Sequence, residues 1–166
     1  MKKLLFTLFM LVIAISFMAH GAKADTIWVV DFANNTPPAG VSVVTQYCWD
    51  SGNYCSFYSG DSLLTINFNL KDKKYLRYQL KVTDCSSDTR LATAPPEQFG
   101  RYSPLTIAVN NFTIANNIDI SWTYDQMNVY DLGDSIKAGN NFITLDNAQN
   151  SVTLYKIRRV ELIGSY

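Results

Sequence analysis

Regular alternation of apolar and polar side chains dominates two neighbouring segments of the chain. In residues 62–70, apolar residues alternate with threonine and asparagine, and residues 76–83 repeat the pattern with charged or polar residues between apolar ones. A period of two is typical of half-buried β-strands, whereas helices repeat about every 3.6 residues. Because only residues 71–74 separate the two segments, we expect them to form an antiparallel hairpin.

The rest of the chain carries the same strand signals and almost no helical ones. Residues 118–124 alternate in the same way, residues 132–138 suggest a single helical turn, and a break in phase at Arg158 and Arg159 predicts a bulge. Antiparallel strands with one polar face each pack as two layers. The predicted fold class is all-β, an antiparallel two-sheet β-sandwich. Shorter strands are expected at Thr26 to Phe32, Val41 to Tyr47, Leu105 to Val109, Asn141 to Leu145 and Val152 to Ile163.

The first 24 residues have the three parts of a cleavable signal peptide. Two lysines precede an apolar run from Leu4 to Ala19, and the small-x-small triplet of residues 22–24 follows. A membrane anchor is the competing interpretation, but a membrane span needs about 20 apolar residues and this run is shorter. We therefore expect a secreted or periplasmic protein with no membrane span after cleavage. Residues 25–166 then form a single β-sandwich domain.

Charge and histidine content exclude several classes of function. Three of the 14 basic residues lie in the leader, so the net charge of the exported part falls to about −3. Nucleic-acid binding normally requires a basic stripe, so no nucleic-acid partner is expected. The single histidine, His20, also lies in the leader. Nucleophilic catalysis and transition-metal binding usually rely on imidazole, so neither a catalytic residue nor a metal site is predicted.

Three cysteines, Cys48, Cys55 and Cys85, remain in the exported part, where disulfides persist. A disulfide between Cys48 and Cys55 would close a short loop and leave Cys85 as the unpaired thiol. Three free thiols are the alternative.

The C-terminal part of the chain resembles a known superfamily. The segments Leu105 to Ile114, Leu132 to Leu145 and Lys156 to Gly164 resemble the galactose-binding-like jelly-roll domains, a fold common among carbohydrate-binding modules. The resemblance covers residues 105–164 and concerns structural positions, so no ligand-binding residue is carried over from it. It implies a jelly-roll sandwich. Asn111 stands where such domains usually have glycine, and asparagine tolerates the positive φ of such a turn.

Side chains with carboxylate or amide oxygens give two weaker signals of function, a calcium site and a pair of catalytic carboxylates. The oxygen atoms of Asp125, Asn128 and Asp131 suit calcium, which members of the resembled superfamily often hold, but their spacing matches no fixed loop motif. No cofactor is therefore predicted, with structural calcium left open. A glycosidase needs two facing carboxylates. Glu97 with Asp84 or Asp88 is the available pairing, so a carboxylate-dependent glycan-active enzyme stays a minority alternative.

The predicted binding site follows from where the long loops fall. If successive strands reverse direction, the connections at residues 48–61 and 84–104 emerge at the same end of the sandwich. Aromatic and arginine side chains on such loops are the groups that stack on sugars or anchor protein contacts. The candidate ligand-binding residues are Trp49, Asp50, Tyr54, Tyr58, Phe99, Arg101 and Tyr102.

These observations favour an exported, non-catalytic binding module whose ligand is a carbohydrate. The alternative is a protein-interaction domain, such as an envelope component or a secreted factor directed at a host or a neighbour. The expected partner is a glycan or a protein surface.

Overall fold

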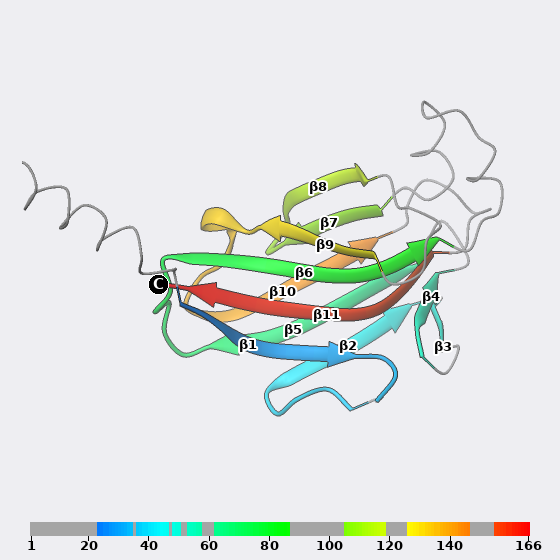
Figure 1. Cartoon of the computed structure of the whole chain (residues 1–166), viewed down its shortest axis with the longest axis horizontal. Helices are drawn as coiled ribbons and strands as arrows, with labels where there is room; N and C mark the ends of the chain where they lie inside the picture. The colour runs from blue at the N-terminus through cyan, green and yellow to red at the C-terminus, as the bar shows by residue number, and fades with distance from the viewer. Residues whose placement is uncertain are drawn as a thin grey trace, which may run out of the picture.

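The computed structural model describes residues 23–34, 36–46, 48–50, 53–57, 62–86, 105–118, 126–146 and 155–166. The described residues are mostly β-strand, and the strands form two antiparallel sheets packed face to face (Figure 1). This arrangement confirms the predicted all-β, two-sheet sandwich. Across these residues, no helix has the length and apolar character needed to cross a bilayer.

Sheet A contains the first and last described strands. β1 (Ala24–Asp31) and β4 both pair with one edge of β11, and β6 pairs with its other edge. Apart from β1, the order is β3 (Cys48–Asp50), β4 (Cys55–Phe57), β11 (Tyr155–Ser165), β6 (Arg77–Ser86) and β9 (Gln126–Asp131).

Sheet B provides the other layer. Its central strand β10 pairs along its whole length with β5 and along half of it with β7. The order is β2 (Val41–Gln46), β5 (Leu63–Leu70), β10 (Gly139–Asp146), β7 (Leu105–Val109) and β8 (Phe112–Ile118). Between β9 and β10 lies the 3-10 turn η3 (Gly133–Ser135), as the sequence predicted.

The core fills the space between the sheets because each strand directs every second side chain inward. β5 buries the alternating residues that the sequence indicated, and β7 and β10 repeat this pattern beside it. The fully buried side chains that the sheets contribute include Leu64, Ile66, Tyr78, Leu80, Leu105, Ile107, Ile143 and Leu145. The register shift between Ile157 and Arg159 confirms the predicted bulge in β11.

The predicted hairpin between residues 62–70 and 76–83 is wrong. β5 lies in sheet B between β2 and β10, whereas β6 lies in sheet A between β11 and β9. Each strand has one apolar face to bury, and crossing from one layer to the other lets these faces meet across the core. Leu76, expected to point inward with β6, precedes that strand and is 89% exposed.

Short strands account for the other differences. β3, β4, β8 and β9 were not predicted, because segments of this kind lack a sustained alternation. The strand expected at residues 118–124 falls almost wholly outside the described residues, with Ile118 as the last residue of β8.

The two ends of the sandwich differ in what they carry. We call the end where β4 and β6 finish and β11 begins the cysteine end, because Cys48, Cys55 and Cys85 all lie in strands there. The opposite end, which carries the C-terminus and the β7–β8 turn, we call the turn end (Figure 1).

At the turn end, Tyr75 closes the core over a glycine. Its ring lies where any β-carbon on Gly164 would have to go, and its hydroxyl donates a hydrogen bond to Asp25 Oδ2 at 3.1 Å. Tyr78 packs edge-on against this ring, with ring centroids 5.7 Å apart, and Tyr166 covers it at 4.9 Å. Tyr75 thereby joins residues of β1, β6 and β11 in one contact.

Candidate functional site: an asparagine-lined hollow on sheet B

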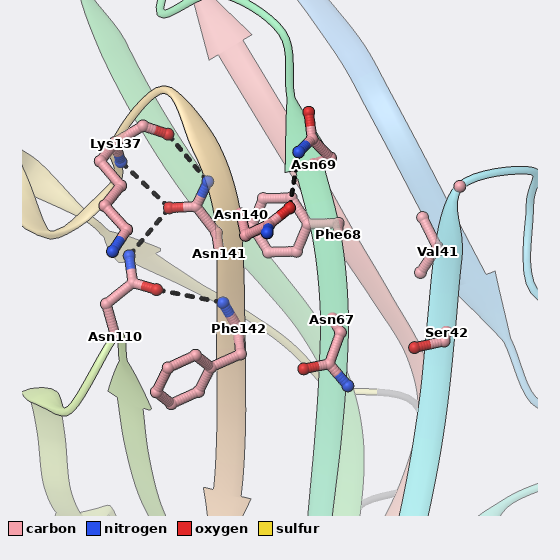
Figure 2. Close-up of a pocket in the computed structure, with 11 residues that line it drawn as sticks. Val41, Ser42, Asn67, Phe68, Asn69, Asn110, Lys137, Asn140, Asn141 and Phe142 are labelled. Carbon is pink, nitrogen blue, oxygen red and sulfur yellow. Dashed lines mark hydrogen bonds between the residues drawn. The ribbon is translucent and has the colours of Figure 1, made fainter.

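The outer face of sheet B carries a hollow of about 630 Å³ near the turn end (Figure 2). It spans β2, β5 and β10 and extends to the β7–β8 turn. We call it the asparagine hollow after its commonest lining residue. Its lining consists of Gly40, Val41, Ser42, Asn67, Phe68, Asn69, Asn110, Lys137, Asn140, Asn141 and Phe142.

Strand alternation places the polar side chains in this hollow. Because Leu64 to Leu70 direct every second residue into the core, Asn67 and Asn69 must point outward. Register then aligns them with neighbours: Asn67 lies opposite Ser42 on one side and Phe142 on the other. Asn69 lies opposite Asn140 and donates a hydrogen bond to its Oδ1 atom at 2.6 Å.

One wall of the hollow is fixed by the β7–β8 turn. Asn110 and Asn111 both adopt positive φ, at 50° and 70°, which confirms that asparagine at position 111 takes the backbone conformation expected there. The side-chain Nδ2 of Asn110 donates a hydrogen bond to the Ser135 carbonyl at 2.7 Å, and its side-chain Oδ1 accepts one from the Phe142 N–H at 3.1 Å. The turn is thereby tied to both η3 and β10.

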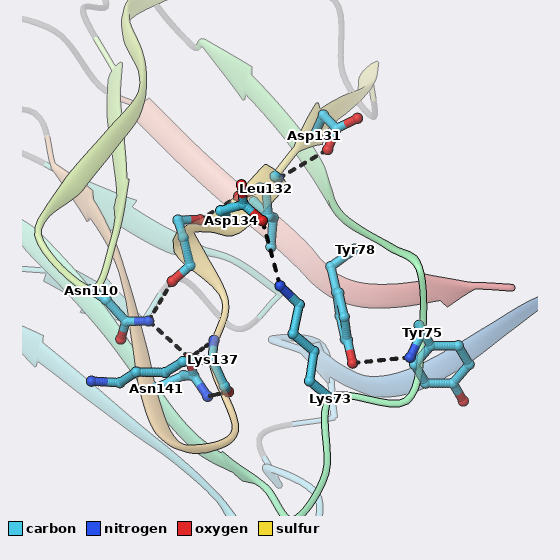
Figure 3. A network of polar contacts seen from close by, with 11 residues as sticks. Lys73, Tyr75, Tyr78, Asn110, Asp131, Leu132, Asp134, Lys137 and Asn141 are labelled. Carbon is cyan, nitrogen blue, oxygen red and sulfur yellow. Dashed lines mark hydrogen bonds and ion pairs between the residues drawn. The ribbon is translucent and has the colours of Figure 1, made fainter.

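Asn141 holds the start of β10 from inside. Its side chain is 3% exposed and uses all four hydrogen-bonding positions of an amide. Oδ1 accepts from the Lys137 N–H at 3.0 Å and from Asn110 Nδ2 at 2.8 Å, while Nδ2 donates to the carbonyls of Lys137 at 2.8 Å and Gly139 at 2.9 Å. These bonds give the wall a fixed shape (Figure 3).

The segment from Asp131 to Asp134, which precedes β10, is also held by contacts outside the hollow. Lys73 Nζ lies 3.7 Å from Asp134 Oδ1 (Figure 3). Asp131 accepts a hydrogen bond from the Gly133 N–H at 3.0 Å and one from Arg77 at 2.6 Å. The Gly133 N–H, with a smaller contribution from Arg77, lowers the pKa of Asp131 and so favours its charged form.

The lining of the hollow suits reversible binding. It offers amide and hydroxyl groups that both donate and accept hydrogen bonds, together with the half-buried ring of Phe142. None of the eleven lining residues carries a carboxylate, thiol or imidazole, so the lining holds no acid and base pair. A hydroxyl-rich ligand with one apolar face matches this chemistry.

Of the seven site residues predicted from the sequence, the three that the structure describes lie at the other end of the sandwich. Trp49 and Asp50 belong to β3 at the cysteine end. Tyr54 precedes β4 and is half-buried, with Lys156 Nζ 5.8 Å from its ring centroid. The remaining candidates, Tyr58, Phe99, Arg101 and Tyr102, fall outside the described residues. The binding role of this set stays a prediction.

The asparagine hollow was missed in the sequence because its residues are far apart in the chain. The available signal was the kind of residue on the outward positions. β5 presents Asn67 and Asn69 outward, and β10 presents Asn140 and Phe142. Amides on two strands become a site only once those strands are known to be neighbours.

The acidic candidates do not form a common site in the described residues. Asp84 is buried in β6, where Asn128 Nδ2 donates to its Oδ1 at 3.0 Å. Burial and the nearby Asp84 charge raise the pKa of Tyr130. Asn128 and Asp131 point to opposite faces of β9, so they do not share a calcium site, and no described cluster of acidic, cysteine or histidine side chains could hold a metal ion. Asp88, Glu97 and Asp125 lie outside the described residues.

Cys48 and Cys55 lie in neighbouring strands, but the register does not place them directly opposite each other. Cys48 lies opposite Phe57 and Cys55 opposite Asp50, which makes Cys48 and Cys55 a diagonal pair. Diagonal Cα atoms are about 7–8 Å apart, and a disulfide usually spans about 4.4–6.8 Å. β11 separates Cys55 from Cys85.

The Cys48–Cys55 disulfide remains a prediction that requires a local shift of the β3–β4 register. We expect mass spectrometry of the unreduced exported protein to show one disulfide linking these two residues, with Cys85 alkylated. Three alkylated thiols in protein recovered from an oxidising compartment would contradict it.

Comparison with known proteins connects this fold to a group of solved structures. No protein-family model matches the chain, and no curated protein matches its sequence. Its structure is similar to a family 35 carbohydrate-binding module from Clostridium thermocellum, with a TM-score of 0.55 and 17% identity, covering 82% of this chain and 98% of that one. The chain has the jelly-roll fold of such modules.

A second solved structure agrees. A family 35 carbohydrate-binding module from an environmental isolate matches with a TM-score of 0.54 and 14% identity, covering 84% of this chain and 98% of that one. Both modules are covered almost completely, so the resemblance extends well beyond the C-terminal segments that suggested it. This confirms the jelly-roll expectation drawn from residues 105–164.

Proposed function

We propose that this protein is an exported, non-catalytic carbohydrate-binding module and that the asparagine hollow is its glycan-binding site. The observation that carries the proposal is the composition of the hollow: outward amides of Asn67, Asn69 and Asn140 beside the half-buried ring of Phe142. Support also comes from the fold, which is that of modules named for carbohydrate binding.

The chemistry of a sugar ring fits this surface. Its hydroxyl groups donate and accept hydrogen bonds at once, which an amide can match with two contacts. Its C–H face is apolar and packs on an aromatic ring. The hollow places both kinds of group within one row of the sheet, because Asn67 lies opposite Phe142.

Preformed walls support binding without a large ordering cost. Asn110 and Asn141 are held by hydrogen bonds within the protein, so the hollow keeps its shape before a ligand arrives. A rigid site loses less conformational entropy on binding than a mobile one.

Replacing Phe142 with alanine is expected to weaken glycan binding at least about tenfold, since an aromatic anchor in a binding site contributes more than about 1.4 kcal/mol. Asn67→Ala should act in the same direction. The exported chain would first be screened on a glycan array and by polysaccharide pull-down, and its best ligand then titrated by calorimetry.

Phe112→Ala is the matched control. Phe112 is 66% exposed at the β7–β8 turn and is not among the residues that line the hollow. Affinity should stay within about twofold of the parent. Failure of the exported chain to bind any glycan across broad panels, at concentrations suited to weak ligands, would refute the proposed function.

The site predicted from the sequence, which includes Tyr54 at the cysteine end, is the alternative location for the same function. Tyr54→Ala distinguishes the two sites, because Tyr54 lies at the opposite end from the hollow. Glycan binding that is lost with Tyr54→Ala and kept with Phe142→Ala would move the site to the cysteine end.

A further inference from the structure

Two lysines lie at the asparagine hollow or next to it, and the proposed function gives neither of them a role. Lys137 lines the hollow itself, and Figure 2 shows its side chain extending to a position beside Asn110. Lys71 follows β5, two residues after Asn69. Both side chains are exposed.

Lys71 lines a second hollow of about 430 Å³ that adjoins the first. Asn69 belongs to the lining of both, so the two hollows meet at this residue. The second hollow lies at the turn end, where its lining includes Lys71, Asp72, Lys74 and Tyr75. Asn69 is therefore the point at which a ligand longer than the asparagine hollow would meet the second hollow.

The lysines at this end differ in whether their charge already has a partner. Lys73 Nζ is paired with Asp134, and Lys74 Nζ lies 4.7 Å above the Tyr75 ring. In the described part of the chain, the ammonium groups of Lys71 and Lys137 have no ion-pair partner. These two charges are thus available to a ligand.

The charges along this path favour an anion. The asparagine hollow has one cation and no carboxylate, and the second hollow has Lys71 and Lys74 against Asp72. The chain as a whole has a formal net charge of +0, so the positive excess is local. A carboxylate or sulfate between lysines and amides gains charge-assisted hydrogen bonds, which are stronger than neutral ones.

We infer that the ligand is an acidic glycan whose neutral ring faces Phe142 and whose carboxylate or sulfate groups are bound by Lys137 and Lys71. This inference rests on the proposed function and names its substrate class.

The test compares glycans that differ only in charge. Uronate oligosaccharides are titrated beside their carboxyl-reduced forms, and sulfated oligosaccharides beside their desulfated forms. We expect the exported chain to bind one acidic form at least about tenfold more tightly than its neutral counterpart. That preference should shrink as salt concentration rises, because exposed charges are screened.

Charge-removing variants assign the effect to the two lysines. Lys137→Gln and Lys71→Gln should each weaken binding of the acidic form about three- to tenfold more than they weaken binding of its neutral counterpart. Lys81→Gln on the outer face of sheet A removes the same charge far from the hollow and should change neither.

Two results would overturn the inference while leaving the proposed function intact. One is equal affinity for the acidic and neutral forms of every pair. The other is polyglutamate binding as tightly as the acidic glycan, which would show attraction for any polyanion. Absence of binding to all glycans, charged or neutral, would instead refute the proposed function together with this inference.

Discussion

Gly164→Ala is expected to destabilise the protein by about 1–3 kcal/mol, the usual cost of forcing extra volume into a packed site. A β-carbon at this position would overlap the ring of Tyr75, well inside van der Waals contact. The ring has little room to move, because Asp25, Tyr78 and Tyr166 hold it. Thermal unfolding should shift downward by several degrees.

The destabilisation has the opposite sign from what strand propensity alone predicts. Glycine inside a strand normally costs about 0.5–1 kcal/mol relative to alanine, so an unhindered glycine would gain from the change. A double-mutant cycle with Tyr75→Ala separates the two effects. In the Tyr75→Ala background, Gly164→Ala should become neutral or stabilising.

Ser165→Ala provides the matched control, since Ser165 is the half-buried neighbour in the same strand and should change stability by less than about 0.5 kcal/mol. If Gly164→Ala costs the same with and without the Tyr75 ring, the contact described at the turn end is not the cause.

Asn141→Ala is expected to cost about 2–3 kcal/mol and to loosen the wall of the hollow. The change removes four hydrogen bonds and leaves the Lys137 N–H and the carbonyls of Lys137 and Gly139 without their partner. Polar groups left unsatisfied in a partly buried site cost about 1–3 kcal/mol each, offset where water reaches them. Denaturant titration and glycan calorimetry measure the two effects on one variant.

Asn140→Ala tests the stability effect at the adjacent position. Asn140 is exposed and its described side-chain bond goes to Asn69, which is also exposed, so stability should change by less than about 0.5 kcal/mol. Asn141→Asp is a stricter variant, because a carboxylate keeps the acceptor bonds but cannot donate to the carbonyls of Lys137 and Gly139. Its stability should fall at least as far as that of Asn141→Ala at pH 7. Equal stabilities for Asn140→Ala and Asn141→Ala would contradict the role given to Asn141.

Local pattern predicted the strands well, because burial of one face imposes a period of two. β5 was found within one residue of its bounds, and the phase break in β11 predicted a bulge that the register shows. The pairing of strands was harder. β5 and β6 each present an apolar face, and that pattern is equally compatible with neighbours in one sheet and with partners across the core.

The candidate site was harder to predict than the strands, because it too depends on which strands are neighbours. The aromatic residues near the cysteines were predicted as a site because they cluster along the chain. Ser42, Asn67 and Phe142 are far apart in the sequence and become neighbours only through the register of three strands. A site on the face of a sheet is distributed over the sequence at the spacing of its strands. Sequence reasoning finds loops more readily than faces, since a loop is local.

The pairing of β1 with β11 has a consequence for the predicted cleavage of the leader. The predicted cleavage point lies between Ala24 and Asp25, and these residues are already strand residues, opposite Ser165 and Gly164. The Asp25 side chain is also bonded to Tyr75. If the leader is cleaved at this point, we expect cleavage to precede the pairing of β1 with β11, because a peptide bond inside a paired strand is closed to a peptidase.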